Sequence, residues 1–355
     1  LLADLGARVI KVERPGWGDT TRHFDDVAGG MSSYFTWMNR GKESIGIDMK
    51  DASARPVLEA LLDRADIVVQ NLAPGSAAAL GIDARALVAG RPRLIAVDMA
   101  GYGSDGPNAT RRAYDLLVQA ESGSCAATGW PGMPAKPGPP VADLGSGLMA
   151  AVQILAAVHR REAGGEGAAI EVSMFDVAAD FLGFALLHAL HTGKERPPTG
   201  LGSPAVAPYS GYPTRDGRTV VLGTTNDAEW QRLTTLLLGR PDLAEDPAYA
   251  TNDGRCGRRD EVDAIIAAWT SERDAADICA AAERAGIGNA LYRTVLEAVD
   301  HPDLVERGRW TTTDSPVGPI ASLRSPVSSL PWDVPVGAVP GLGEHTDSIL
   351  AELAL

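Results

Sequence analysis

Asp66-Ile67-Val68-Val69-Gln70 and Arg93-Leu94-Ile95-Ala96-Val97 are short apolar runs, and a helical pattern at 83–89 separates them. Runs of this length without polar alternation are typical of strands that are buried on both faces, as in a parallel sheet. Similar runs at 8–12 and 44–48 precede them, with another helical pattern at 52–63. Strands that alternate with helices indicate right-handed βαβ units. The sequence therefore predicts an α/β fold whose first half is Rossmann-like.

The middle of the chain continues with helical patterns at 113–123, 145–161 and 173–192, and with a strand at 169–172. The composition then shifts to Pro, Gly and Ser around 197–213, which is typical of a linker between domains.

A smaller α+β unit is predicted beyond this linker. Asp216-Gly217 lies between apolar runs and indicates the turn of a β-hairpin at 212–222. Helical patterns follow at 228–238, 259–270 and 275–285, and a proline-rich segment at 326–340 leads to a last helix near 345–353. We predict a large domain at 1–196, a small domain with linkers at 197–320, and a C-terminal return to the large domain at 321–355.

The overall composition is that of an ordinary globular enzyme. Of 355 residues, 45% are hydrophobic and 22% are charged, and the net charge of −14 argues against broad nucleic-acid binding. The sequence shows no signal peptide and no apolar run of the roughly 18 to 20 residues that span a bilayer, so we expect a cytoplasmic protein without a membrane partner. The three cysteines lack metal-ligand or redox spacing, so we expect neither a metal site nor a disulfide.

The segment Pro140-Val141-Ala142-Asp143-Leu144-Gly145-Ser146-Gly147 places one aspartate before a long apolar helical pattern. A carboxylate at a helix N-terminus meets unpaired backbone N–H groups and the positive end of the helix dipole, which favour its ionised form. Asp143 can therefore be an ordinary N-cap or a nucleophile that is held ionised. The local pattern leaves both interpretations open.

Asp115 follows Tyr114 at the start of the predicted helix at 113–123. It can be an ordinary acid of a first helical turn, or the second carboxylate of an active site. Two acids that share a pocket separate their pKa values, so that one stays ionised and the other can carry a proton. Position alone does not decide between these roles.

Two other functional classes find little support. Gly101-Tyr102-Gly103-Ser104-Asp105-Gly106 matches the dinucleotide-binding fingerprint of a dehydrogenase. However, Pro107 and the pair Arg111-Arg112 stand where an apolar helix should receive the pyrophosphate, so we interpret the segment as a loop. The six histidines accompany no Ser or Cys nucleophile motif, so a hydrolase triad is not indicated.

Several segments together resemble the class III CoA-transferases. They are 2–15, 39–44, 70–75, 140–147 and 343–346, which occur in the order of that family and span nearly the whole chain. The resemblance implies an interlocked homodimer whose subunits each combine a Rossmann-like large domain with a small domain. It also implies acyl-CoA and a small carboxylic acid as substrates, with coenzyme A as a substrate and no permanently bound cofactor.

The resemblance also assigns roles to individual residues. The nucleophile of the family falls on Asp143, its neighbouring acid falls on Asp115, and Gly200 and Gly202 would form a flexible loop over the site. Asp143 would form an anhydride with the acyl group and then an aspartyl-CoA thioester, which the acceptor acid consumes. The CoA groove would be lined by Arg14, Lys50, Asn71, Leu72 and Gly75, with Arg40, Lys42 and Arg112 as further phosphate partners.

The sequence departs from the pattern of its relatives at several positions. Racemases of this fold carry a histidine where this chain has Tyr114, which favours CoA transfer over an isomerase that uses Asp143 and Asp115. The short glycine run at 200–202 makes oxalate or formate a less favoured substrate, and 203–214 resembles members that act on dicarboxylic acids. The chain begins about two dozen residues inside the family pattern, so the first strand of that pattern is expected to be missing. A non-catalytic acyl-CoA-binding relative is the third alternative.

Overall fold

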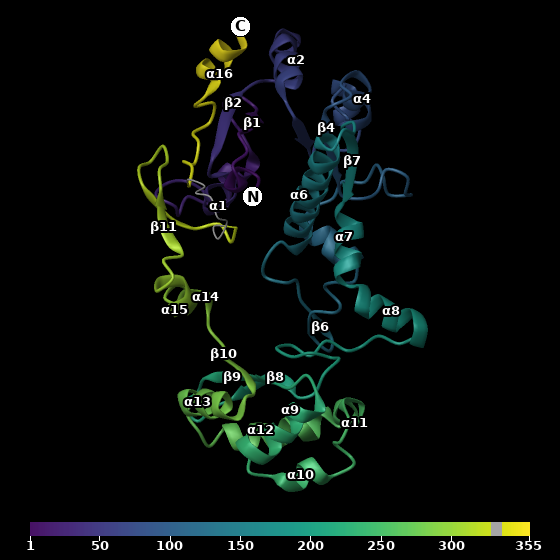
Figure 1. The fold of residues 1–355 in the computed structure, drawn as a ribbon, viewed down its shortest axis with the longest axis vertical. Coiled ribbons are helices and arrows are strands. Elements are labelled where there is room, and N and C mark those ends of the chain that lie inside the picture. The colour runs from purple at the N-terminus through teal and green to yellow at the C-terminus, as the bar shows by residue number, and fades with distance from the viewer. Residues whose placement is uncertain (328–335) are drawn as a thin grey trace. The chain divides into compact units, whose positions relative to one another are not determined.

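The computed structural model describes residues 1–327 and 336–355, so the predicted proline-rich segment at 326–340 lies mostly outside the described residues. The chain forms two compact units (Figure 1). The first unit comprises Leu1–Tyr114, Asp143–Val177 and Val299–Leu355, and the second comprises Asp115–Ala142 and Ala178–Ala298. The domain boundaries that we derived from the sequence stay a prediction.

Parallel strands form the framework of the first unit. Strand β1 (Val9–Glu13) pairs in parallel with β2 (Lys42–Gly46). Strands β3 (Ile67–Gln70), β4 (Ile95–Ala100) and β7 (Ala168–Ser173) form a second parallel sheet in the order β3-β4-β7. The predicted strands are confirmed, although they belong to two separate sheets within the described residues rather than to one.

Helix α2 (Arg55–Arg64) packs against both sheets of the first unit. Val57 and Leu61 contact a cluster that includes Ile45 of β2, whereas Leu58 and Leu62 belong to a cluster with Ala96 of β4. The two clusters use adjacent faces of one helix, because Val57 and Leu58 are one residue apart and an α-helix turns by about 100° per residue.

The long helix α6 (Val141–Glu162) packs on the larger sheet. Ala150 and Ile154 lie in one core cluster with Ile95 and Val97 of β4 and Val172 of β7. The helix begins four residues before the predicted start at 145, so Asp143 lies inside its first turn and is not the N-cap. This corrects our sequence prediction.

We expected no apolar run long enough to span a bilayer, but α6 meets that criterion by length and composition. Its length and a mean hydropathy of 1.7 over 18 residues would allow it to cross a membrane. Core helices of soluble proteins meet the same criterion, and one face of α6 is buried on the sheet. The pattern at 173–192 is also not one helix: α7 (Met174–Phe181) and α8 (Gly183–Thr192) meet at a bend of 71°.

The C-terminal segment is hydrogen-bonded to β2. Gly343 N–H donates to Ser44 Oγ at 2.9 Å, Ser44 N–H donates to His345 Nδ1 at 3.2 Å, and Gly46 N–H donates to Thr346 Oγ1 at 3.0 Å. Helix α16 (Thr346–Leu353) then packs Ile349 against the β1–β2 sheet. The segment 343–346, which carried part of the family resemblance, therefore holds the chain end in place.

The second unit contains an antiparallel sheet in the order β10-β9-β8, formed by β8 (Tyr209–Pro213), β9 (Thr219–Gly223) and β10 (Gly288–Leu291). The predicted hairpin is confirmed, because β8 and β9 pair around Gly217, whose φ of +74° suits glycine.

Helices cover the sheet of the second unit. They include α9 (Asp227–Arg232), which continues into a π-helical turn (Leu233–Leu237), and α12 (Arg259–Thr270) and α13 (Ala275–Ala285). Trp230, Leu233, Val262, Ile266 and Ile278 form the centre of this core.

The other described elements are short. They are η1 (Ala3–Leu5), η2 (Thr20–His23), α1 (Ser33–Asn39), η3 (Ala52–Ala54), α3 (Ser76–Leu80), α4 (Ala84–Gly90), α5 (Asp115–Glu121), β5 (Gly129–Trp130), β6 (Met133–Pro134), α10 (Pro241–Glu245), α11 (Asn252–Gly257), α14 (Val295–Val299), α15 (Pro302–Val305), β11 (Trp310–Thr313) and β12 (Ile320–Leu323).

Candidate active site

Asp143 lies in the first turn of α6 and is exposed. The turn continues with Gly145 and Ser146, which are buried and small, so the helix can pack closely while Asp143 faces outward. A helix of this length presents partial positive charge at its N-terminus, which stabilises a carboxylate in the first turn. Asp143 therefore combines access for a substrate with an environment that favours its ionised form.

Asp115 reaches the same helix end through a hydrogen bond. Its Oδ1 accepts the backbone N–H of Ala142 at 3.0 Å, and Ala142 directly precedes Asp143 in the chain. Its Oδ2 accepts from the amide of the buried Gln119 at 2.6 Å, and Lys136 Nζ lies 3.9 Å away. Because the first N–H groups of a helix lack partners within the helix, this bond explains why α6 begins early. Only 12% of the Asp115 side chain is exposed, whereas Tyr114 is 68% exposed.

Gly200 and Gly202 lie in a segment that is anchored in the second unit. Gly200 N–H donates to the carbonyl of Gly129 at 2.6 Å, and its φ is +59°. Gly202 pairs with Ser210 in an isolated β-bridge. A Cβ at Gly200 would lie 2.2 Å from the Trp130 ring. Gly200 therefore has a packing reason to be glycine, and the role of both residues in a loop over the active site stays a prediction.

Replacing Gly200 with alanine should lower the melting temperature of the protein. The new methyl group would overlap the Trp130 ring, and the left-handed backbone conformation disfavours alanine. We expect a loss of about 1–3 kcal/mol of folding free energy, measured by thermal denaturation. Gly217→Ala is the matched control, because its φ is also positive but no atom lies within 4 Å of its Cβ position. Equal losses in both variants would contradict the packing argument.

Part of the predicted CoA groove lies where the strands of the first unit end. Arg14 follows β1, Lys50 lies beyond β2, and Asn71 and Leu72 follow β3. Ligands of open α/β sheets bind at the carboxyl ends of strands. Arg14, Lys50 and Asn71 are exposed, and Leu72 N–H is held by Gln70 Oε1 at 2.7 Å.

Two of the other predicted groove residues, Arg40 and Lys42, lie at the opposite edge. Lys42 is the first residue of β2 and pairs with Val9, so it lies at the amino end of the parallel pair, and Arg40 lies just before it. Arg40 forms an ion pair with Asp4 at 3.1 Å. Burial, with a smaller contribution from Lys11, lowers the pKa of Lys42 to about 8. Gly75 caps α3 with φ +79°, and Arg112 is exposed before α5.

The fingerprint-like segment 101–106 forms turns and no helix, as predicted. A Cβ at Gly101 would lie 2.1 Å from the Ala113 Cβ, so close packing explains this glycine. Within the described residues, no group of three or more His, Cys, Asp or Glu side chains could hold a metal ion.

Sequence reasoning missed the buried Glu13 at the end of β1. Its carboxylate accepts hydrogen bonds from Arg22 at 2.7 and 2.9 Å, from Ser44 Oγ at 2.6 Å and from Asp19 N–H at 2.9 Å. Burial alone would raise the pKa of Glu13, but these hydrogen bonds outweigh it and lower the pKa below 4.5. No local sequence pattern indicates that Glu13 is buried and hydrogen-bonded, because its partner Ser44 is distant in sequence.

Comparisons with known proteins agree with the resemblance seen in the sequence. The family described as "CoA-transferase family III" matches residues 1–346. The chain is 37% identical to the acetyl-CoA:oxalate CoA-transferase of Acetobacter aceti, covering 86% of this chain and 79% of that protein. It is 34% identical to the succinate–glutarate CoA-transferase of Agrobacterium fabrum, with 99% and 90% covered. A CAIB/BAIF family protein from Brucella suis has a similar crystal structure, with a TM-score of 0.82, 33% identity, and 99% and 93% covered.

Proposed function

Because the chain belongs to CoA-transferase family III, we propose that it transfers CoA from an acyl-CoA thioester to a small carboxylic acid through the carboxylate of Asp143. The observation that carries this proposal is the position of Asp143, exposed in the first turn of α6. The helix dipole favours the ionised form that a nucleophile needs.

The reaction balances without any further reactant. An Asp143 carboxylate oxygen attacks the thioester carbon, the C–S bond breaks, and CoA leaves as the thiolate with a mixed anhydride on the enzyme. The thiolate attacks the aspartyl carbonyl of this anhydride and releases the donor acid as its carboxylate. The acceptor carboxylate then attacks the aspartyl-CoA thioester, and the same two steps run in reverse. Both intermediates keep a carboxyl group activated, first as the mixed anhydride and then as the aspartyl-CoA thioester, as long as water is excluded.

Asp115 acts in this proposal as the companion acid that positions the helix end. Its bond to Ala142 N–H fixes the backbone next to the nucleophile, and Gln119 and Lys136 hold the carboxylate in place. A nucleophile that is fixed in its orientation loses less entropy on reaching the transition state. Tyr114, where related racemases carry histidine, supports transfer rather than proton exchange.

We propose a dicarboxylic acid as the acceptor. The Agrobacterium fabrum relative is named for succinate and glutarate, and the Acetobacter aceti relative is named for oxalate. The short glycine run made oxalate a less favoured substrate in our sequence prediction, but a relative named for oxalate is 37% identical to this chain, so oxalate belongs in the test.

An acceptor screen should separate dicarboxylic from monocarboxylic acids. With succinyl-CoA as donor, we expect kcat/KM for glutarate, oxalate or mesaconate to exceed that for butyrate by at least about 100-fold. The reason is that a site built for a second carboxylate leaves buried polar groups unpaired when that carboxylate is missing. Chromatography of the CoA esters measures the products, with Asp143→Ala as the blank. Turnover of monocarboxylates alone would reject the acceptor class.

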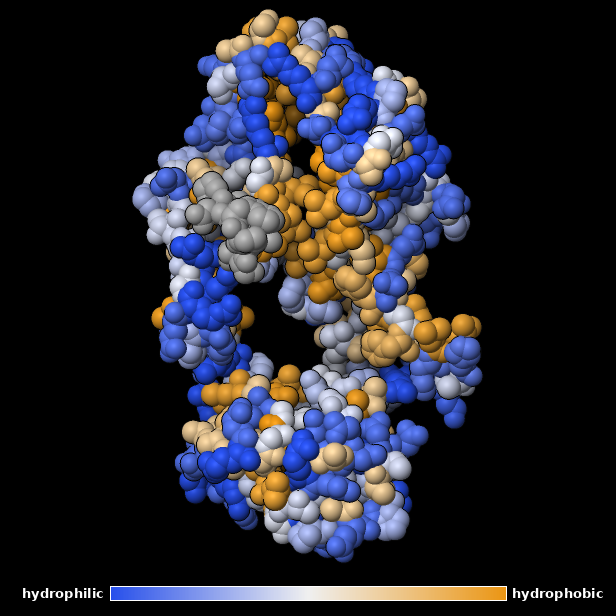
Figure 2. Space-filling view, viewed as in Figure 1, coloured by the Kyte–Doolittle hydropathy of each residue, from blue (hydrophilic) through white to orange (hydrophobic). Residues whose placement is uncertain are grey.

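We also propose that the protein acts as the interlocked homodimer that its family resemblance implies. The face of α6 away from the sheet exposes Leu148, Val152 and Leu155, and Figure 2 shows a hydrophobic area over this helix. In the second unit, α8 exposes Phe184, Leu187 and Leu190. Contiguous apolar areas of this kind are typical of surfaces that a partner covers, and a second copy of the chain is the partner proposed here.

A further inference from the structure

The segment that leads into helix α6 is bound by the side chain of Lys136. Its ammonium group donates to the carbonyls of three successive residues, Pro137 at 2.7 Å, Gly138 at 3.0 Å and Pro139 at 3.3 Å. A lysine has three N–H donors, and hydrogen bonds from a charged donor are stronger than neutral ones. One side chain therefore holds the backbone directly before Pro140 and Val141, where α6 begins.

The backbone of this segment has few donors of its own. Pro137, Pro139 and Pro140 have no N–H group, which leaves Gly138 as the one main-chain donor among these four residues. A residue that precedes proline is restricted to extended conformations, which stiffens the segment but does not fix its direction. The bonds from Lys136 fix the direction, so the position of the start of α6 depends on this lysine.

The same ammonium group faces the companion acid. Lys136 Nζ lies 3.9 Å from Asp115 Oδ2, within the distance of an ion pair. Asp115 Oδ2 also accepts from Gln119, and its Oδ1 accepts the N–H of Ala142 in the first turn of α6. The side chains of Lys136 and Asp115 are 31% and 12% exposed, so solvent screens their interaction less than that of a surface pair. Lys136 thus contacts both the segment that enters the helix and the carboxylate that binds its first turn.

The residues before Lys136 belong to a hairpin that is anchored in the second unit. Strands β5 and β6 pair with each other, and Ala135 N–H donates to the carbonyl of Thr128 at 3.0 Å. Gly200 N–H donates to the carbonyl of Gly129 in β5 at 2.6 Å. The hairpin is therefore attached to the segment that carries Gly200, and Lys136 extends from an ordered base.

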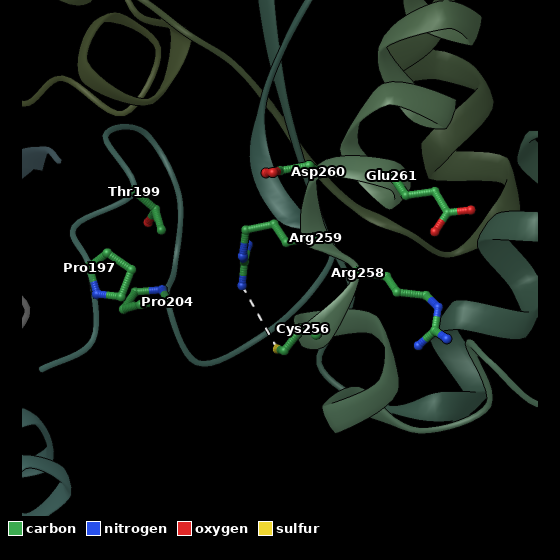
Figure 3. Close-up of a pocket in the computed structure, with 9 residues that line it drawn as sticks. Pro197, Thr199, Pro204, Cys256, Arg258, Arg259, Asp260 and Glu261 are labelled. Atoms are coloured by element: carbon green, nitrogen blue, oxygen red, sulfur yellow. Dashed lines mark hydrogen bonds between the residues drawn. The ribbon is translucent and has the colours of Figure 1, made fainter. Parts of the chain in front are cut away.

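The segment 197–204, which carries that attachment, is itself held by helices. Figure 3 shows it on one side of a cavity of about 550 Å³, with the junction of α11 and α12 on the other side. Arg259 of this junction donates to the carbonyl of Val206 at 2.8 Å, and Asn252 of α11 donates to the carbonyl of Ala205 at 3.0 Å. The hairpin is thereby connected to the helical core of the second unit.

We propose that Lys136 is a positioning residue for the Asp143 nucleophile. Its ammonium group holds the segment 137–139 and faces Asp115, and both contacts fix the first turn of α6 in the orientation that attack on the thioester requires. The inference rests on the proposed transfer function, because that function gives the orientation of Asp143 its catalytic consequence. Lys136 acts through the backbone and through Asp115, and it forms no bond to the reacting atoms.

Lys136→Met tests the role, because methionine keeps an unbranched apolar side chain but lacks the ammonium group. We expect kcat for CoA transfer from succinyl-CoA to glutarate to fall about 10- to 100-fold, since a small displacement of a reacting group costs up to about 100-fold. The dissociation constant of CoA, measured by isothermal titration, should stay within about twofold. Amide hydrogen exchange of a peptide that contains residues 141–147 should become faster, because the helix start opens more often.

Two further variants separate positioning from charge and from a general effect of losing a lysine. Lys136→Arg keeps the charge beside Asp115, but a planar guanidinium cannot direct donors at three successive carbonyls as an ammonium does. Its kcat should stay at least about threefold below that of the parent. Lys194→Met is the matched control: Lys194 is exposed in the same unit, and its bonds to Thr192 use backbone atoms. It should keep the kcat, CoA affinity and exchange of the parent.

Three results would overturn the inference: parent-like kcat in Lys136→Met, a fall in kcat without faster exchange at the start of α6, or full activity in Lys136→Arg, which would show that charge alone suffices. Failure of the proposed function is distinguishable from these results. In that case the parent protein itself would show neither turnover nor an adduct on Asp143, and the catalytic role of Lys136 would be rejected with it. Hydrogen exchange would still show whether Lys136 holds the helix start.

Discussion

Asp143→Asn should abolish CoA transfer and leave the fold unchanged. The amide cannot form the anhydride on which every later step depends, so we expect kcat to fall by at least about 10⁴-fold, the scale of losing a covalent nucleophile. Asp143 is exposed in a first helical turn, and losing its charge there should cost only about 0.3–1 kcal/mol of folding free energy.

Intact-mass spectrometry after incubation with acyl-CoA gives the decisive measurement for Asp143. The parent protein should gain a covalent acyl or CoA adduct, and Asp143→Asn should gain none. Asp277→Asn provides the matched control, because Asp277 is also an exposed acid in the first turn of a helix, α13. It should keep both the adduct and the activity. An adduct of the same size on Asp143→Asn would show that another residue is the nucleophile.

The best-predicted elements are two helices of the second unit, and one of them, α13, has local sequence signals at both ends. Helices α12 and α13 have the bounds 259–270 and 275–285 that we predicted. Helix α13 follows an aspartate, Asp274, and ends at Gly286, whose φ of +65° suits a helix C-terminus. A helix with such signals depends little on distant parts of the chain.

The errors arose where a distant residue decides the local structure. Helix α6 begins at Val141 because Asp115, far upstream in sequence, accepts the N–H of Ala142. The local pattern at 140–147 therefore offered Asp143 as a possible N-cap, whereas the carboxylate of Asp115 binds the N–H group of Ala142 at this helix end. The break between α7 and α8 at Leu182 carries no proline, so periodicity alone predicted one continuous helix.

The candidate site likewise contains residues that local signals identify and residues whose position depends on distant parts of the chain. Asp143 and Asp115 could be proposed from sequence because each lies at a helix start, and because Asp143 lies within the motif at 140–147 and the neighbouring acid of the family falls on Asp115. The predicted phosphate partners do not all lie at one edge of the sheet, because the parallel register of β1 and β2 puts Lys42 at one edge and Arg14 at the other. Register is a long-range property, and no local pattern reports it.

Glu13→Gln should cause a large loss of stability, because Glu13 joins four parts of the first unit. It belongs to β1, accepts from Arg22 and from the N–H of Asp19, and accepts from Ser44 of β2. Ser44 in turn accepts from Gly343 N–H in the C-terminal segment. Removing the charge leaves a largely buried guanidinium without its counter-ion, at a cost of about 3–5 kcal/mol.

The same variant should alter how stability depends on pH. The pKa of Glu13 in the folded protein is lowered below its ordinary value of 4.5. Its contribution is therefore complete above about pH 4.5 and is lost as the pH falls through the lower, folded-state pKa. The parent should lose stability steeply on acidification below pH 4.5, and Glu13→Gln should show a shallower slope in that range.

Thermal denaturation at pH 7 and at several values below 4.5 measures both effects, with Glu43→Gln as the matched control. Glu43 lies on the neighbouring strand β2 and pairs with Arg8 at 2.8 Å, but this pair is exposed to solvent. Exposed ion pairs contribute about 0–1 kcal/mol, so Glu43→Gln should change the melting temperature little. If the two variants lose equal stability at pH 7, burial is not what makes the Glu13 network strong. If Glu13→Gln keeps the acid slope of the parent, other carboxylates carry the pH dependence.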